Sequence, residues 1–130
     1  MQIRSFEDLE CWKSATELRK EISSLVKRFP KEEKYNLIDQ LIRASRSVTN
    51  NVAEGYGRFH YQENIQFSRQ SRGSLYEIID HIIIAKDELY ITNEEYITLR
   101  NLIDKCLALL NGYINYLINQ KKKTLSIINE

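Results

Sequence analysis

Five arginines that fall between residues 41 and 75 are the side chains of this chain best suited to binding an anion. Arg43 and Arg46 are spaced i, i+3, and Arg69 and Arg72 repeat that spacing, so the members of each pair are neighbours on a helix surface. The fifth is Arg58. A planar guanidinium group binds phosphate through two parallel hydrogen bonds. The spacing therefore indicates a site for the phosphates of RNA or DNA.

The same arginines could instead pair with carboxylates, and the sequence leaves this alternative open. That segment holds only two acidic residues, whereas acidic residues predominate from 76 to 105. Asp39 precedes Arg43 by four positions, and Glu54 precedes Arg58 by four, which is the spacing of an ion pair along a helix. The second pair of arginines could reach carboxylates of a neighbouring helix or subunit. The charge pattern therefore predicts one positive and one negative part of the molecule, without deciding between phosphate and internal pairing.

Two of the four glycines, Gly55 and Gly57, lie at the end of the second helical pattern. A phosphate-binding loop follows a β-strand and carries further glycines or a lysine at fixed spacing, and this stretch has neither. We expect the two glycines to adopt positive φ and to reverse the chain into the next helix. Tyr56, Phe59 and Tyr61 lie at the same turn and could stack on unpaired bases. Core or interface packing is the expected use of at least two of these rings.

No combination of residues typical of an enzyme occurs in the chain. His60 and His81 are 21 positions apart, with no second ligand at the spacing of a metal site. Cys11 and Cys106 lack a C-x-x-C spacing and fall on apolar helical stretches, where a thiol packs as a small hydrophobic group. A disulfide between them is not expected in a reducing compartment. We therefore expect no enzymatic activity, no cofactor and no metal.

These side chains must be positioned by helices, because apolar residues repeat every three or four positions along four segments. The predicted helices span approximately residues 6–29, 31–56, 60–89 and 93–121. Ser5 is expected to cap the first helix, and Pro30 to end it. The apolar stripe of the second helix begins with Tyr35. Thr92 and Glu95 have the spacing of a capping box at the start of the fourth helix.

Short links force neighbouring helices to run antiparallel, and four helices with one apolar face each bury those faces best as a bundle. The sequence thus predicts an all-α fold, an antiparallel up-and-down four-helix bundle that forms a single domain over residues 1–130. With 42% hydrophobic and 28% charged residues, the composition is that of a folded domain rather than a disordered chain. Residues after 121 are expected to form a poorly ordered tail.

The predicted hairpin of the second and third helices brings the two arginine pairs together. If the chain turns near residue 58, Arg46 lies 12 residues before the turn and residue 70 lies 12 after it. Arg43 and Arg46 would then stand at the height of Arg69 and Arg72. Four guanidinium groups at one height would repel one another unless an anion lay among them, and phosphate is the natural candidate.

The third and fourth helices carry more apolar residues than one buried face requires. Leu102, Leu109 and Tyr116 repeat at seven-residue intervals beside the main stripe of the fourth helix, and Ile83 and Ile84 widen the stripe of the third. A second buried surface, between subunits, is the simplest use of this surplus, which predicts a homo-oligomer. The alternative is that some aliphatic side chains and tyrosines lie half exposed.

The sequence predicts a cytoplasmic location with no membrane partner. Its first twelve residues lack the apolar core of a signal peptide, and no stretch approaches the roughly 20 apolar residues that cross a bilayer. The net charge of +1 gives no overall signal for nucleic acid.

Several stretches resemble, in order and at matching spacing, the bacterial "four helix bundle protein" family, whose founding members are encoded by intervening sequences in 23S ribosomal RNA genes. The stretches are FEDLECWKSATEL, RFPKEEKYNLIDQLIRAS, SVTNNVAEGYGR, SRGSLYE and LNGYINYL. The resemblance implies an antiparallel four-helix bundle that assembles as a ring-shaped homopentamer. It also implies a fold similar to the accessory protein of diversity-generating retroelements, which binds a reverse transcriptase and nucleic acid. The family commonly has proline where this chain has Thr49, which leaves a bend in the second helix in doubt.

Together, the residues and the resemblance predict a non-enzymatic, oligomeric bundle that binds RNA or DNA as a ribonucleoprotein accessory factor. The predicted phosphate contacts are Arg43, Arg46, Arg58, Arg69 and Arg72. The alternative is a protein–protein scaffold or adaptor without nucleic-acid binding. Four phosphate contacts would make log K fall with log salt at a slope of roughly −3 to −4, and the scaffold would show no such binding.

Overall fold

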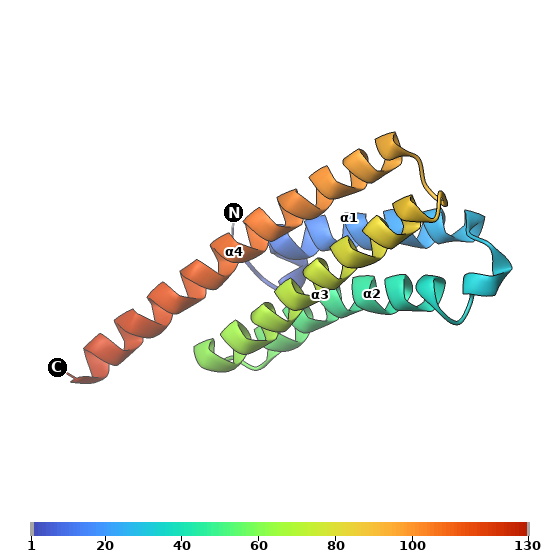
Figure 1. Ribbon diagram of the computed structural model, residues 1–130. Coiled ribbons are helices and arrows are strands. Elements are labelled where there is room, and N and C mark those ends of the chain that lie inside the picture. The colour runs from blue at the N-terminus through green and yellow to red at the C-terminus, as the bar shows by residue number, and fades with distance from the viewer. Residues whose placement is uncertain (1, 130) are drawn as a thin grey trace.

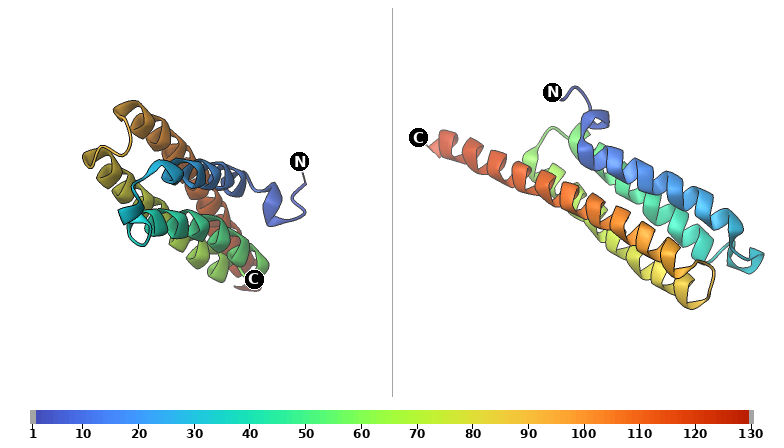
Figure 2. Two further views of the ribbon diagram at one scale, coloured as in Figure 1. Left: turned by 90° about the vertical axis from the view of Figure 1, so that its right-hand side faces the viewer. Right: turned by 90° about the horizontal axis from the view of Figure 1, so that it is seen from above.

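The computed structural model describes residues 2–129 and contains four long helices (Figure 1). The helices are α1 (Glu10–Leu25), α2 (Leu37–Gly57), α3 (Tyr61–Asp87) and α4 (Asn93–Asn129). Among the described residues there is no β-strand, and α2 contacts α1 and α3 while α4 contacts α3 and α1 (Figure 2). The predicted all-α four-helix bundle is confirmed. None of the helices between residues 2 and 129 combines the length and the hydropathy of a membrane span.

The first predicted helix is divided at Leu9. Ser5 caps a short 3-10 turn, η1 (Phe6–Asp8), and its hydroxyl accepts a hydrogen bond from the amide of Glu7 at 2.9 Å. Leu9 then adopts an extended backbone, with φ −71° and ψ 128°, and α1 begins at Glu10. The cap is confirmed, but the α-helix begins four residues later than predicted. Leu9 is buried, so the interruption places its side chain in the core.

The link between α1 and α2 is longer than the sequence indicated. Two 3-10 turns, η2 (Val26–Arg28) and η3 (Lys31–Glu33), lie on either side of Pro30. Proline ends the first helical segment because its ring fixes φ and removes an amide donor. The α-helical geometry resumes only at Leu37, and not at residue 31 as predicted.

The late start of α2 changes which residues reach the core. Asn36, with φ −118° and ψ −103°, separates the preceding turn from α2. Tyr35 therefore lies outside the helix, and its side chain is 81% exposed. Leu37 and Leu41 occupy the core in its place. The predicted stripe was wrong at this end because it assumed one unbroken helix from residue 31.

The turn between α2 and α3 does not use its glycines in the predicted way. Neither Gly55 nor Gly57 has a positive φ, and α2 continues through both. Phe59 adopts the left-handed conformation instead, with φ 59°. A Cβ on Gly55 would lie 2.8 Å from Oδ1 of Asn64 and 2.9 Å from Cβ of Phe67. The prediction of positive φ was wrong, because Gly55 is required by the close approach of two helices.

The turn between α3 and α4 contains the predicted capping box. The amide of Thr92 donates to the carboxylate of Glu95 at 2.9 Å, and the amide of Glu95 donates to the hydroxyl of Thr92 at 3.1 Å. The hydrogen bond from the Thr92 amide is the main cause that lowers the pKa of Glu95. The predicted start of the fourth helix is therefore confirmed.

The core contains side chains from all four helices. The largest fully buried side chains are Leu18, Ile22, Leu41, Val48, Val52, Ile65, Leu75, Ile78, Ile82, Ile103, Cys106 and Leu110. Cys11 and Cys106 are both buried free thiols, as the sequence predicted. Burial raises the pKa of Cys11 to about 12 and also raises that of Cys106. The hydroxyl of Ser14 and the thiol of Cys106 lie 3.0 Å apart, which joins α1 to α4.

The last part of α4 projects beyond the bundle. α4 has 37 residues and α3 has 27, and the C-terminal end of α4 extends past the start of α3 (Figures 1 and 2). Lys121 contacts Gln62 near the point where α4 leaves the other helices. Residues 122–129 are helical, where the sequence led us to expect a poorly ordered tail. Glu130, the last residue of that tail, lies outside the described residues.

Candidate nucleic-acid interface

Small polar side chains fix the register between α2 and α3. The hydroxyl of Ser71 donates to the carbonyl of Val48 at 2.7 Å, and the hydroxyl of Ser74 donates to that of Ser47 at 2.9 Å. Within α2, the side-chain amide of Asn51 donates to the carbonyl and the hydroxyl of Ser47, both at 2.9 Å. These contacts place Val48 beside Ser71 and Ser47 beside Ser74.

This register differs from the predicted one by about one helical turn. A turn centred on residue 58 would have placed Val48 beside residue 68, three residues before its actual neighbour Ser71. It would have placed Ser47 beside residue 69, five residues before its actual neighbour Ser74. The difference arises because α2 ends at Gly57 and α3 begins at Tyr61, so that the reversal is centred later. Arg46 therefore lies near the height of Ser74, and not near residue 70.

Arg72 points toward α4. Its Nη1 donates to Oδ1 of Asn111 at 3.0 Å, and the contact is partly buried. Ser71 faces α2, and the next residue of an α-helix lies about 100° further around its axis. The structure therefore separates the guanidinium group of Arg72 from the arginines of α2.

Arg43 lies on the exposed surface of α2 beside a carboxylate. Its Nη1 is 3.5 Å from Oδ2 of Asp39, and its side chain is 78% exposed. It also borders a hollow of about 350 Å³ between α2 and α3. The other polar residues of this hollow are Gln40, Ser47, Ser74 and Glu77. The guanidinium group and the hydroxyl of Ser47 suit an anion, since the Ser74 hydroxyl already donates to that of Ser47, whereas Glu77 opposes one.

Arg58 takes up both carboxylates that the sequence contains between residues 41 and 75. Its Nη2 is 3.0 Å from Oε1 of Glu54, and its Nη1 is 3.8 Å from Oε2 of Glu63. Its guanidinium carbon also lies 5.2 Å from the ring centroid of Phe67. Arg58 is thus held by two carboxylates and one aromatic face.

Arg46 and Arg69 are the two remaining predicted contacts, and both are exposed. Within the part of the chain that the structure describes, neither forms an ion pair. Because Arg58 occupies the nearby carboxylates, no acidic side chain of this segment compensates their charge.

An aromatic groove of about 500 Å³ lies at the α2–α3 turn. Its rings belong to Tyr56, Phe59, His60, Tyr61, Tyr113 and Tyr116. Phe59 is 86% exposed, and the rings of Tyr113 and Tyr116 stack with centroids 6.5 Å apart. Asn64 donates to the hydroxyl of Tyr113 at 2.9 Å, while burial raises the pKa of Tyr113 to about 12. The groove offers several aromatic faces for stacking.

Sequence reasoning placed Tyr56, Phe59 and Tyr61 at this turn but missed Tyr113 and Tyr116. The two missed tyrosines are spaced i, i+3 on α4, which shows that they share a helix face. Their height relative to the turn depends on the register between α3 and α4. That register follows from contacts such as Asn64 with Tyr113, which the sequence does not reveal.

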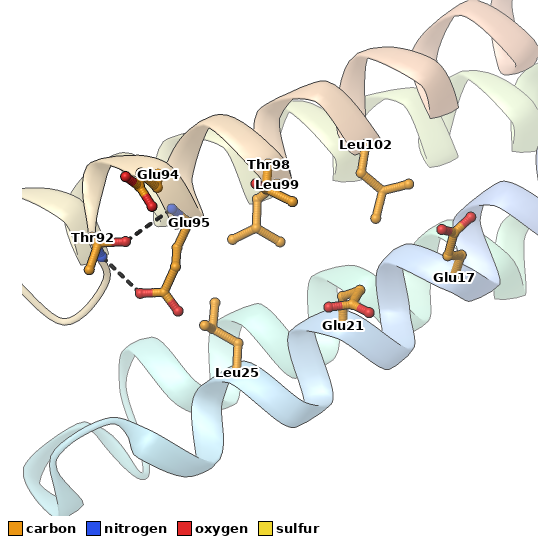
Figure 3. A pocket seen from close by; sticks show the side chains of 9 residues that line it. All are labelled: Glu17, Glu21, Leu25, Thr92, Glu94, Glu95, Thr98, Leu99 and Leu102. Carbon is orange, nitrogen blue, oxygen red and sulfur yellow. Dashed lines mark hydrogen bonds between the residues drawn. The ribbon is translucent and has the colours of Figure 1, made fainter.

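A second groove, of about 480 Å³, lies between α1 and the first turns of α4 (Figure 3). Glu17 and Glu21 line it from α1, and Glu94 and Glu95 line it from α4. Its floor is apolar and is formed by Leu25, Leu99 and Leu102. The sequence predicted a negative part of the molecule but did not reveal that α1 contributes to it.

The histidines do not form a metal site with other side chains of the described residues. His60 is exposed, whereas Nε2 of His81 lies 3.3 Å from Oε2 of Glu77. No group of three or more histidine, cysteine, aspartate or glutamate residues in the described range could hold a metal ion.

A family model named 23S rRNA-intervening sequence protein matches residues 7–112, which is most of the chain. The chain belongs to this family. The match extends over α1, α2 and α3 and continues into α4 as far as residue 112, so the family region includes all the predicted arginine contacts. A comparison with curated proteins finds no match. At Thr49, where the sequence left a bend in doubt, α2 continues without interruption, and the hydroxyl of Thr49 donates to the carbonyl of Arg46 at 3.2 Å.

Proposed function

We propose that this member of the 23S rRNA-intervening sequence protein family is a non-enzymatic homo-oligomer that binds RNA or DNA phosphates in the cytoplasm, as an accessory factor of a ribonucleoprotein. The observation that supports the proposal is the uncompensated charge of Arg46 and Arg69. The two acidic residues between residues 41 and 75, Glu54 and Glu63, are both engaged by Arg58. An exposed guanidinium group without a carboxylate partner retains all its donors for a phosphate.

The arrangement of the arginines defines what kind of binding to expect. Arg43, Arg46 and Arg69 are exposed on two helices, whereas Arg72 is bonded to Asn111. Three phosphate contacts release fewer counterions than four, and they would give a slope of log K against log salt of about −2 to −3. Contacts limited to phosphate carry no information on base sequence. We therefore expect binding that depends strongly on salt and weakly on sequence.

The aromatic groove supports a preference for single strands. Unstacked bases can stack on exposed aromatic rings, at about 1–3 kcal/mol per base. Phe59 and Tyr116 in this groove are 86% and 54% exposed. Paired bases in a duplex cannot enter such a groove without first leaving their stack.

The first experiment compares two double variants with the same change in net charge. Arg46→Gln with Arg69→Gln removes the uncompensated charges. Arg28→Gln with Arg100→Gln is the control, because these arginines contact Glu95 and Asp104 near the α3–α4 turn. The measurement is fluorescence anisotropy of a labelled RNA and a labelled DNA, titrated at several salt concentrations.

We expect the first variant to bind at least about tenfold more weakly at low salt, with a salt slope reduced by about 1.4 to 1.8 for two lost contacts. The control variant should bind like the native protein. The proposal is lost if the native protein binds neither RNA nor DNA at low salt. If native binding survives unchanged in Arg46→Gln with Arg69→Gln, the phosphate site does not include these residues.

A second experiment separates stacking from phosphate binding. Phe59 has a positive φ, which costs a bulky residue about 1 kcal/mol or more and which glycine adopts freely. Phe59→Gly should therefore leave the protein at least as stable as before while removing an exposed ring. We expect weaker binding of single strands and unchanged binding of duplexes. Equal loss for both substrates would contradict a stacking role.

The alternative function, a protein–protein scaffold, is favoured by apolar side chains on the outside of the bundle. Tyr76, Ile83, Ile84 and Ile97 are between 38% and 58% exposed. If the oligomer forms but binds neither RNA nor DNA, the scaffold function is favoured over nucleic-acid binding.

A further inference from the structure

We propose that the projecting end of α4 in one copy, residues 122–128, docks into the acidic groove between α1 and α4 of a second copy. This inference rests on the homo-oligomer of the proposed function and does not depend on nucleic-acid binding. The two surfaces that would meet are the exposed end of α4 in one copy and the groove of Figure 3 in the other.

The groove has a charge that the protein itself does not neutralise. Glu17, Glu21 and Glu94 are exposed, and none of them forms an ion pair within the described residues. Glu95 alone has a cationic partner, Arg28. Carboxylates that face one another across a groove repel, so a cation between them would be stabilising. The groove therefore favours a basic occupant.

The floor of the groove favours an occupant that is also apolar. Leu25 and Leu102 are half-buried, whereas Leu99 between them is buried. The side chains of all three point into the space between α1 and α4 (Figure 3). An amphipathic helix that presents both lysines and aliphatic side chains would match this lining.

The projecting end of α4 has this composition. Leu125 and Ile128 are spaced i, i+3 and are 48% and 71% exposed. Lys122 lies next to this stripe on the helix surface, because it precedes Leu125 by three positions. Lys122 and Lys123 are exposed and form no ion pair in the described chain. An exposed aliphatic stripe with adjacent lysines is complementary to a leucine floor with adjacent glutamates.

The occupant must come from a second copy. The groove contains residues 94 to 102 of α4, and the lysines follow on the same continuous helix. At 1.5 Å per residue, residue 98 and residue 122 are about 36 Å apart along the helix axis. A rigid helix cannot bring its own end back over that distance. Because the two surfaces differ, the contact is head-to-tail, and it builds a ring if its rotation closes and a filament if it does not.

The main experiment reverses the charges and then exchanges them. Glu17→Lys with Glu21→Lys reverses the charge on the α1 side of the groove, and Lys122→Glu with Lys123→Glu reverses the charge of the helix end. Each double variant should have the mass of one chain, 15.4 kDa, at concentrations where the native protein is an oligomer. The variant that carries all four substitutions should regain the native mass, because the complementary charges have changed places. The measurement is light scattering after size exclusion, without nucleic acid.

The control is Glu32→Lys with Asp80→Lys, which changes the net charge by the same amount at exposed positions outside the groove. It should keep the native mass. All substituted residues are exposed, and circular dichroism shows whether each variant remains helical. If the native protein is a single chain at every concentration, the oligomer of the proposed function fails together with this inference. If the native oligomer persists in both double variants, only this inference is overturned.

A cross-linking experiment tests the head-to-tail geometry directly and does not depend on charge. Cys11 and Cys106 are buried, so cysteines introduced at exposed positions would react first. Glu21→Cys and Lys122→Cys are prepared separately, and a short bismaleimide is added to each alone and to their mixture. We expect cross-linked dimers in the mixture and none with either variant alone. Dimers from Glu21→Cys alone would show a symmetric contact and contradict the proposal.

Discussion

The α2–α3 hairpin and the α1–α4 pair differ in how closely their two helices pack. Between α2 and α3 the side chains are small, and the helices meet through serine hydroxyls and through Gly55. Between α1 and the start of α4 the groove is lined by glutamates, and Leu25 and Leu102 remain half-buried. Small residues let two backbones approach, whereas long charged residues keep them apart. The first pair is therefore closely packed within one chain, whereas the second leaves apolar surface partly exposed.

The largest loss of stability is expected for a substitution in the core beneath the floor of the open groove. Ile103 is fully buried and its neighbour Leu102 is half-buried, although both belong to the same turn of α4. Ile103→Ala should lower the free energy of unfolding by about 3 kcal/mol, because it removes buried methyl groups and leaves a cavity. Leu102→Ala should cost about 1 kcal/mol, since its side chain is already partly in water. Urea denaturation measures both, and equal losses would show that the groove is not open in solution.

In the closed hairpin, the largest loss of stability is expected when a side chain is added at Gly55. A Cβ at this position would lie within 3.0 Å of Asn64 and Phe67, whereas one at Gly57 would meet no atom within 4 Å. Gly55→Leu should therefore lower stability by about 2 kcal/mol through overpacking. Gly57→Leu is the matched control and should change stability by less than about 0.5 kcal/mol. A harmless Gly55→Leu would mean that α2 and α3 are less closely packed than described.

The two buried thiols predict how the α1–α4 side responds to alkaline pH. The pKa of Cys11 is raised from 9.0 to about 12, so this thiol stays protonated in the folded protein while the unfolded chain loses the proton. Its contribution to stability is fully present below pH 9 and is lost as the pH rises toward 12. The steepest loss for one such group is about 1.4 kcal/mol per pH unit.

Thermal unfolding between pH 8 and pH 11 measures this effect. Cys11→Ala should reduce the pH dependence, and the decline that remains should come from Cys106, Tyr113 and Tyr90, whose pKa values are also raised. The same burial predicts slow reaction of native Cys11 with a thiol reagent at pH 8 and fast reaction after unfolding. Fast labelling of the native protein would place Cys11 outside the core.

The smallest effect is expected for a single hydroxyl of the closed hairpin. Ser71→Ala removes the 2.7 Å hydrogen bond to the carbonyl of Val48 and should cost about 1 kcal/mol. Thr92→Ala is the corresponding change beside the open groove, because it removes the cap of α4, and it should also cost about 1 kcal/mol. Neither change should alter the mass in solution. A change in mass with Thr92→Ala would show that the cap also shapes the surface between subunits.

The predicted elements agreed with the structure where local interactions decide the backbone. Ser5 and the pair Thr92 with Glu95 form their caps because both partners lie within three residues in the chain. The start of α2 and the conformation of Gly55 were predicted incorrectly. In both places the outcome depends on which side chains reach the core or a neighbouring helix, and that information is not local.

In the candidate site, too, contacts within one helix were predictable from the sequence and contacts between helices were not. Arg43 and Arg58 lie near the carboxylates four residues before them, as the spacing indicated. The partner of Arg72 is Asn111, 39 residues away, and no spacing within one helix predicts it. The height of α3 beside α2 also required the serine contacts. The exposure of Arg46 and Arg69 is therefore a property of the assembled bundle.

By itself the sequence determined the helical periodicity, the four-helix bundle, the caps, the buried thiols and the membership of a family. These depend on the order of apolar, polar and capping residues over a few turns. Only the tertiary structure decided the register between α2 and α3, the direction of Arg72, the aromatic groove at the turn and the acidic groove between α1 and α4. The physical reason is that a shift of one helical turn changes every contact between helices while it leaves the apolar stripe of each helix almost unchanged.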